Sequence, residues 1–149
     1  QGQPKVIEFN CRFGDPETQP IMMRLKSSLV DLVEAGIAGN LPAEAQWDER
    51  KTVGIVLASK GYPETSSKDD VIYGLDTEMT DAKVFHAGTA VNANGEIVTA
   101  GGRVLCVTAL GNTIGEAQAK ALELCEKVTF DGVQYRKDIG YRAIAREQA

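Results

Sequence analysis

Three polar side chains near the start of the chain alternate with apolar ones. In the stretch "VIEFNCRFGDPETQP", Glu8, Asn10 and Arg12 stand two positions apart. In a β-strand this spacing places a carboxylate, an amide and a guanidinium on one face. Mg²⁺ accepts carboxylate and amide oxygens, and an arginine beside it can stabilise a phosphoryl group in transfer. The stretch therefore predicts a metal-phosphate site; the alternative is a strand whose polar face contacts water.

Two further residues could bind a polar or anionic ligand. Asp15 lies in the Gly-Asp-Pro turn after this stretch, either as a ligand-binding carboxylate or as an ordinary turn aspartate. Arg103 follows two glycines in "GGRVL", where the backbone can approach a ligand closely and an arginine fork suits a phosphate. The alternative for Arg103 is a solvated side chain on a bulged strand. His86, the single histidine, is expected to have a structural role.

The composition is that of one ordinary globular domain. The chain has 149 residues, 43% of them hydrophobic, and a net charge of -5. The negative charge argues against nucleic-acid binding, and the lack of a long apolar run argues against a membrane segment or a signal peptide. The three cysteines are odd in number and widely spaced, which predicts reduced thiols and a cytoplasmic location.

The hydrophobic pattern predicts an α+β protein that divides near residue 50. The first part, residues 1–50, offers one strand at 4–11, one helix at about 18–35 with Gly36 as its C-cap, and a polar connector. One strand and one helix cannot bury both of their faces, so we expect this part to be the end of a larger domain.

The second part, residues 51–149, is predicted to be a small β-rich domain with one helix. A strand begins at 52, "NANG" predicts a hairpin turn, and the helix spans about 112–128. Further strands are predicted in "VIYGLD" and in "VTFDGVQYRKDIGYRAI".

Four segments, taken in order, resemble the phosphoribosylamine–glycine ligase family of ATP-grasp ligases in purine biosynthesis. They are "EFNCRFGDPETQP", "VFHAGT", "GGRVLCVTALG" and "FDGVQYRKDIGYRA". The resemblance implies that residues 1–50 are the last strand and helix of an ATP-grasp domain, followed by a connector, and that 51–149 form a barrel-like C-terminal domain. Members of the family are several hundred residues long, so it also implies an upstream nucleotide-binding part, without which the chain would be inactive.

The resemblance implies an activity as well as a fold. Such a ligase uses ATP to join glycine to 5-phosphoribosylamine through glycyl phosphate, giving glycinamide ribonucleotide, ADP and phosphate. It implies that Glu8 and Asn10 bind Mg²⁺ or Mn²⁺, that Arg12 is catalytic, and that Asp15 and Arg103 bind the phosphoribosyl substrate. It further leads us to expect that charged residues at 136–142 form ion pairs between the two domains.

Two other functions remain open at this point. The chain could be a non-catalytic binding or docking module, or part of another ATP-grasp carboxylate–amine ligase. A docking module needs no metal site, so Glu8, Asn10 and Arg12 distinguish it from a ligase. The expected partners of a ligase are ATP, glycine, 5-phosphoribosylamine and the upstream part, with no nucleic acid and no membrane.

Overall fold

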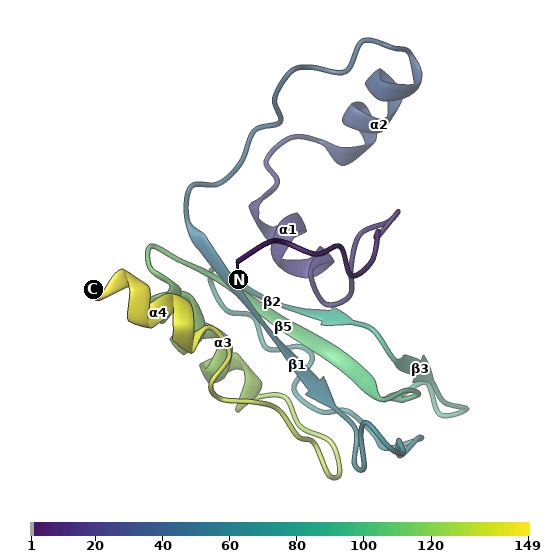
Figure 1. The fold of residues 1–149 in the computed structure, drawn as a ribbon. Helices are drawn as coiled ribbons and strands as arrows, with labels where there is room; N and C mark the ends of the chain where they lie inside the picture. Colours follow the sequence, from purple (N-terminus) through teal and green to yellow (C-terminus); the bar gives the residue numbers. More distant parts are fainter. Residues whose placement is uncertain (1) are drawn as a thin grey trace.

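A three-stranded antiparallel sheet forms the centre of the protein (Figure 1). The computed structural model describes residues 2–149. The strands lie in the order β1 (Lys51–Ala58), β5 (Arg103–Gly111) and β2 (Ala82–His86). A second sheet pairs β3 (Thr89–Val91) with β4 (Ile97–Thr99) around the predicted hairpin turn. The mixed α+β class is confirmed.

Helix α3 (Ile114–Cys125) covers one face of the sheet and closes the core. The Thr113 side chain accepts a hydrogen bond from the Glu116 backbone N–H (3.1 Å), as a helix N-cap does. The apolar stripe of this helix is buried against alternate residues of β1 and β5. The buried residues include Ile55, Leu57, Leu105, Val107, Ala117, Ala121 and Leu124. Burial alternates along β1 with a period of two residues, and it follows the helical period of 3.6 residues along α3. Both periods are visible in the order of apolar residues, so the strand and the helix were predictable from the sequence.

Helix α1 (Thr18–Arg24) lies on the opposite face of the sheet (Figure 1). It comes close because Gly54 of β1 has no side chain. A Cβ atom at Gly54 would lie 3.0 Å from Pro20 Cγ and 3.3 Å from Cys106 Sγ. This close approach brings the segment that precedes α1, with Asp15, over the sheet.

The single helix predicted at about 18–35 is wrong; the segment forms two helices, α1 and α2 (Leu29–Ile37). The chain is extended at Leu25, and the Ser28 hydroxyl then caps α2 by accepting from the Asp31 backbone N–H (3.3 Å). Serine is a favoured N-cap residue, which explains why a second helix begins after Ser28. The C-cap of α2 is Ala38 rather than the predicted Gly36.

The strand predicted at 4–11 does not form. Residues 2–11 belong to no helix or strand and are exposed. A strand needs a hydrogen-bonded neighbour, and none of the described residues pairs with this segment. The alternating pattern is present, but the local structure depends on a partner.

Two other predicted strand regions are also wrong. "VIYGLD" and the stretch after α3 make only isolated bridges, such as Tyr73 with Thr129 and Ala58 with Gln134. Gly74 has a φ of +81°, which turns the chain out of an extended strand. The end of the chain forms helix α4 (Tyr141–Glu147).

An ion-pair network ties the connector to the sheet and to α3. Arg50 donates to both carboxylate oxygens of Asp48 (3.0 and 2.8 Å) and pairs with Asp81 (2.8 Å), which lies 3.5 Å from Lys120. Arg24 of α1 donates to the Asp48 carbonyl (2.9 and 3.0 Å). The network therefore fixes α1 relative to the sheet.

The Asp48 carboxylate should make the stability depend on pH. Hydrogen bonds from the Arg50 side chain and then from its backbone N–H hold the pKa of Asp48 far below the usual 3.8. The stabilisation is complete above the usual pKa and is lost as the pH falls below it, because the unfolded chain takes up the proton first. In Asp48→Asn we expect a lower free energy of unfolding at neutral pH and a deficit that shrinks in acid.

Denaturant titrations at about pH 7 and about pH 3 measure this difference. Asp131→Asn is the matched control, since Asp131 is exposed and belongs to none of the ion pairs of the described chain. An Asp48→Asn deficit of the same size at both pH values would contradict the assignment.

Candidate functional site

An ion pair joins two of the predicted substrate-binding residues. Arg103 Nη2 lies 3.0 Å from Asp15 Oδ2. Arg103 begins β5, whereas Asp15 precedes α1, so the docking of α1 on the sheet brings them together. Thr18 fixes the turn before α1, because its backbone N–H and its hydroxyl both donate to the Gly14 carbonyl (3.1 and 2.6 Å). Both side chains of the pair are about half exposed and can be reached by a ligand.

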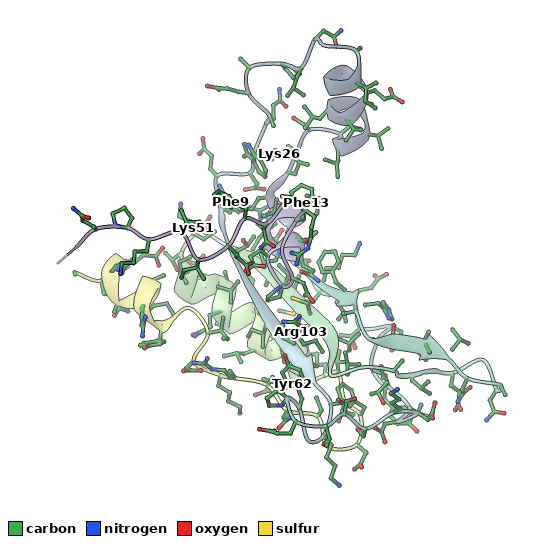
Figure 2. All side chains as sticks on the ribbon, turned by 45° about the vertical axis from the view of Figure 1, so that its right-hand side comes forward. Phe9, Phe13, Lys26, Lys51, Tyr62 and Arg103 are labelled. Carbon is green, nitrogen blue, oxygen red and sulfur yellow. The ribbon has the colours of Figure 1, made fainter. Side chains whose placement is uncertain are left out.

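The glycines beside Arg103 serve chain packing. A Cβ at Gly88 would lie 2.7 Å from the Arg103 carbonyl oxygen, and a Cβ at Gly102 would lie 2.5 Å from the Tyr62 ring. The expectation that the two glycines of "GGRVL" open the backbone to a ligand stays a prediction; at Gly102 the structure shows a close approach of Tyr62. Figure 2 shows Tyr62 and Arg103 near the same end of the sheet.

The predicted metal and catalytic residues lie in the exposed segment before α1. Glu8, Asn10 and Arg12 are all exposed, and Arg12 donates to the carbonyl of the neighbouring Phe13 (3.2 Å). Within residues 2–149 no ion pair engages the three side chains. Phe9 and Phe13 are exposed beside α1 (Figure 2), and the Phe9 side chain is 82% exposed.

The donor chemistry of Glu8 and Asn10 fits magnesium. No cluster of three or more His, Cys, Asp or Glu side chains occurs within the described part of the chain. Mg²⁺ is usually held by one or two protein oxygens and completes its shell with water and substrate phosphates. One carboxylate and one amide oxygen are therefore a sufficient protein contribution for a metal whose other ligands are water and phosphate oxygens.

A mostly apolar hollow of about 450 Å³ is lined by Pro16, the residue after Asp15, and by Ala58, which pairs with Arg103 in the sheet. Pro16, Val56, Tyr62, Tyr135 and Arg136 are among its lining residues. The hollow was not predictable from the sequence, because its walls come from the N-terminal segment, β1 and two loops. The Gln134 amide fixes the loop of Tyr62 by donating to the carbonyls of Ser59 (2.9 Å) and Tyr62 (3.2 Å).

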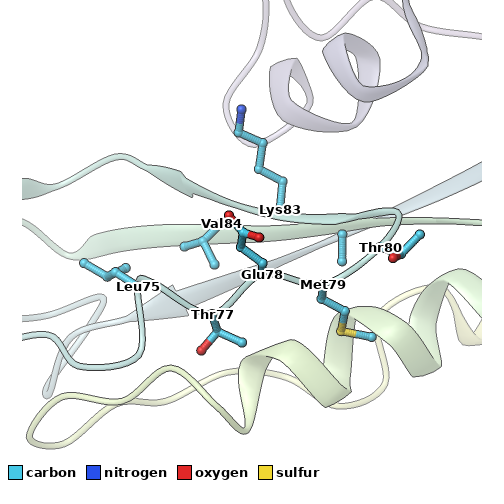
Figure 3. Close-up of a pocket in the computed structure, with 8 residues that line it drawn as sticks. Leu75, Thr77, Glu78, Met79, Thr80, Lys83 and Val84 are labelled. Atoms are coloured by element: carbon cyan, nitrogen blue, oxygen red, sulfur yellow. The ribbon is translucent and has the colours of Figure 1, made fainter.

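A larger hollow of about 680 Å³ lies beside β2 and contains none of the predicted residues (Figure 3). Its lining runs from Leu75 to Val84. Lys83 extends from β2 toward the N-terminal helices, and its ammonium group lies 5.4 Å from the Phe85 ring centre.

The remaining predicted residues have local structural contacts. His86 Nδ1 lies 3.1 Å from Thr89 Oγ1, which fits the structural role expected for it. The ion pairs expected between the two domains at 136–142 stay a prediction, since within the described residues 136–142 make no ion pair with residues 2–50. Arg136 pairs with Asp138 two residues away (2.7 Å), and this contact lowers the pKa of Asp138. The Arg50 network takes that linking role.

The cysteines are free thiols, with Cys106 and Cys125 buried and Cys11 exposed. Burial raises the pKa of Cys125 to about 12, so its thiol stays protonated. Within the described residues, no helix combines the length and the apolar character needed to cross a membrane.

Comparisons with known proteins agree with the resemblance. A family model described as "Phosphoribosylglycinamide synthetase, C domain" matches residues 52–142. A phosphoribosylamine–glycine ligase of Yersinia pestis is 61% identical over 97% of this chain, and one of Pseudomonas aeruginosa is 62% identical over 99%. This chain covers 34% of each of these two proteins.

A solved structure agrees with the sequence matches. The crystal structure of phosphoribosylamine–glycine ligase from Thermotoga maritima superposes with a TM-score of 0.76 at 40% identity, over 93% of this chain and 34% of that one. The chain thus spans about a third of the length of the curated relatives that it matches. The chain belongs to the phosphoribosylglycinamide synthetase family and corresponds to its C-terminal domain region.

Proposed function

We propose that the chain is the C-terminal part of an ATP-dependent ligase that joins glycine to 5-phosphoribosylamine. The observation that carries the proposal is the ion pair between Asp15 and Arg103. The resemblance assigns both residues to one substrate, and they lie in contact although they are far apart in sequence. Membership of the family supports the same activity. We expect the reaction in the cytoplasm, where cysteines stay reduced.

In this proposal Arg103 binds the 5-phosphate and Asp15 orients the sugar or its amine. A guanidinium fork forms strong charge-assisted hydrogen bonds with a phosphate, and a carboxylate accepts from hydroxyl or amine donors. The mutual pair is solvent-exposed, so it contributes little to stability and can open for a ligand at small cost. Holding the amine near the acyl carbon supplies the proximity that the second step requires.

The first step phosphorylates the glycine carboxylate, and we assign Arg12, Glu8 and Asn10 to it. The Arg12 guanidinium stabilises charge on the transferring phosphoryl group. Glu8 and Asn10 hold Mg²⁺ or Mn²⁺, which neutralises phosphate charge when bound. In the second step the amine nitrogen attacks the acyl carbon of glycyl phosphate, phosphate leaves, and the amide bond forms.

We further propose that the exposed N-terminal segment and α2 contact the upstream part of the longer enzyme. The relatives are about three times as long as this chain. Ile7 and Phe9 are exposed, and α2 buries none of its apolar residues, so that Ile37 remains 84% exposed. A strand partner for residues 4–11 would come from that upstream part, together with most of the ATP site.

Arg103→Met tests the substrate assignment. The assay uses a fusion protein in which residues 1–149 replace the matching third of the Pseudomonas aeruginosa ligase. Losing a charged hydrogen bond to phosphate should raise KM for 5-phosphoribosylamine about 10- to 100-fold and leave KM for glycine unchanged. Steady-state kinetics with each substrate varied in turn gives these values.

Arg142→Met is the matched control, since Arg142 is an exposed arginine that contacts the adjacent Tyr141. It should leave both KM values unchanged. An Arg103→Met enzyme with a normal KM for 5-phosphoribosylamine would contradict the assignment of Arg103 to this substrate.

A further inference from the structure

We propose that the hollow beside the Asp15–Arg103 pair binds the base of a ribonucleoside 5′-monophosphate, which thereby competes with 5-phosphoribosylamine. The inference rests on the proposed function, which assigns Arg103 and Asp15 to the phosphoribosyl group. The inference gives this site a second class of ligand beside 5-phosphoribosylamine. A nucleotide carries a heteroaromatic ring at the position where the substrate carries an amine. Such binding makes the site inhibitable by nucleotides.

Neighbours of both members of the ion pair line the hollow. Pro16, which directly follows Asp15, lines it. Tyr62 lines it as well, and its ring packs against Gly102, the residue before Arg103. Figure 2 shows Tyr62 and Arg103 at this end of the sheet. A ligand whose phosphate contacts Arg103 can therefore extend over Tyr62 into the hollow.

The walls suit a ring better than a sugar amine. Val56, Tyr62, Tyr135 and Ile139 give apolar or aromatic surface, and the volume of about 450 Å³ lies in the usual range for small-molecule sites. Tyrosine rings stack on any base, because every base has a π-face. A phosphorylated sugar amine gains little from such walls, so the proposed reaction does not account for them.

The charges at the rim select an anionic ligand. Arg136 lines the hollow, and Arg103 pairs in the sheet with Ala58, which also lines it. Each arginine is paired with an aspartate, Asp15 at 3.0 Å and Asp138 at 2.7 Å, and both pairs are exposed. Exposed pairs open at small cost, so the Arg103 guanidinium can turn from Asp15 to a phosphate. A nucleotide is thus favoured over an uncharged nucleoside.

Calorimetric titration of the 149-residue chain tests the inference with three probes: adenosine 5′-monophosphate, ribose 5-phosphate and adenosine. The chain spans about a third of its relatives, so its binding is measured apart from the ATP site that we assign to the upstream part. Stacking of the base should make adenosine 5′-monophosphate bind at least about tenfold more tightly than ribose 5-phosphate. Adenosine should bind more weakly than its monophosphate.

Two variants separate the base from the phosphate. Val56→Phe fills the hollow without removing core atoms, so binding of the nucleotide should fall to the level of ribose 5-phosphate, whose own affinity stays unchanged. Val91→Phe, at an exposed position of β3, is the matched control and should change neither. Arg103→Met should weaken both phosphorylated probes.

The outcomes distinguish this inference from the proposed function. If ribose 5-phosphate binds through Arg103 but the nucleotide binds no more tightly, or if Val56→Phe has no effect on it, the base site is wrong and the substrate assignment stands. If Arg103→Met weakens neither phosphorylated probe, the phosphate assignment fails and the base site fails with it. A chain that binds no nucleotide at all also contradicts the inference.

Discussion

Replacing Glu8 by alanine is expected to lower turnover of the fusion protein about 100- to 1,000-fold, with little change in stability. The proposal makes Glu8 the only carboxylate that this chain supplies to the metal on the ATP phosphates. Removing one group that stabilises developing charge typically costs a factor of this size. Stability should change little, because the Glu8 side chain is exposed in this chain and makes no ion pair within the described residues. Single-turnover ADP release and thermal unfolding measure the two quantities.

Glu44→Ala provides the control for this prediction. Glu44 is an exposed carboxylate in the connector, outside the proposed site, and its loss should leave ADP release unchanged. Raising the magnesium concentration should partly restore the Glu8→Ala enzyme, since a weakened metal site can be filled by mass action. Normal turnover in Glu8→Ala would exclude Glu8 as a metal ligand.

The largest loss of stability is expected for Leu105→Ala. Leu105 is fully buried on β5, between the neighbouring strands and α3. Truncating a buried leucine removes transfer free energy and leaves a cavity, at a cost of about 2–5 kcal/mol. A domain of ordinary stability has about 5–15 kcal/mol in total, so this one change removes a large share. Denaturant unfolding of the 149-residue chain gives the difference.

Val91→Ala is the matched control for Leu105→Ala. Val91 lies on β3 and its side chain is 65% exposed, so its truncation should cost less than about 0.5 kcal/mol. Comparable losses in the two variants would mean that the layer between the sheet and α3 is not the main core of the chain.

The elements that were predictable from the sequence carry their own local signals. The hairpin turn between β3 and β4 follows from Asn92, Ala93, Asn94 and Gly95, and Gly95 has the positive φ that such a turn uses. Helix α3 follows from its cap at Thr113 and its apolar stripe. In each case neighbouring residues determine the structure, so a single sequence is sufficient.

The failed predictions depend on contacts that a sequence does not display. The pattern of residues 4–11 is that of a strand, but no described segment pairs with it. The helix predicted at 18–35 breaks because Ser28 caps a new helix and Leu25 bridges to Trp47, which is distant in sequence. The segment after α3 has strand-like composition but packs as loops against β1 and then forms α4.

The sequence motifs indicated which residues belong to the candidate site, but not which of them lie in contact. The contact between Asp15 and Arg103 follows from the docking of α1, which Gly54 permits, and nothing local in either motif indicates it. The Tyr62 loop carries no motif that predicts a site, yet Gln134 holds it beside Gly102, the residue before Arg103. The apolar and aromatic walls of the hollow come from four separate segments, so no single stretch of the sequence indicates them.

The most direct test of the central claim is product formation by the fusion protein beside the upstream part of the Pseudomonas aeruginosa ligase alone. The assay supplies magnesium, ATP, glycine and 5-phosphoribosylamine, omits each substrate in turn, and measures ADP and glycinamide ribonucleotide together. We predict stoichiometric formation of both products by the fusion protein, complete dependence on every substrate, and no product from the upstream part alone. A folded fusion protein that forms no glycinamide ribonucleotide, or an upstream part that is equally active without these residues, would contradict the claim.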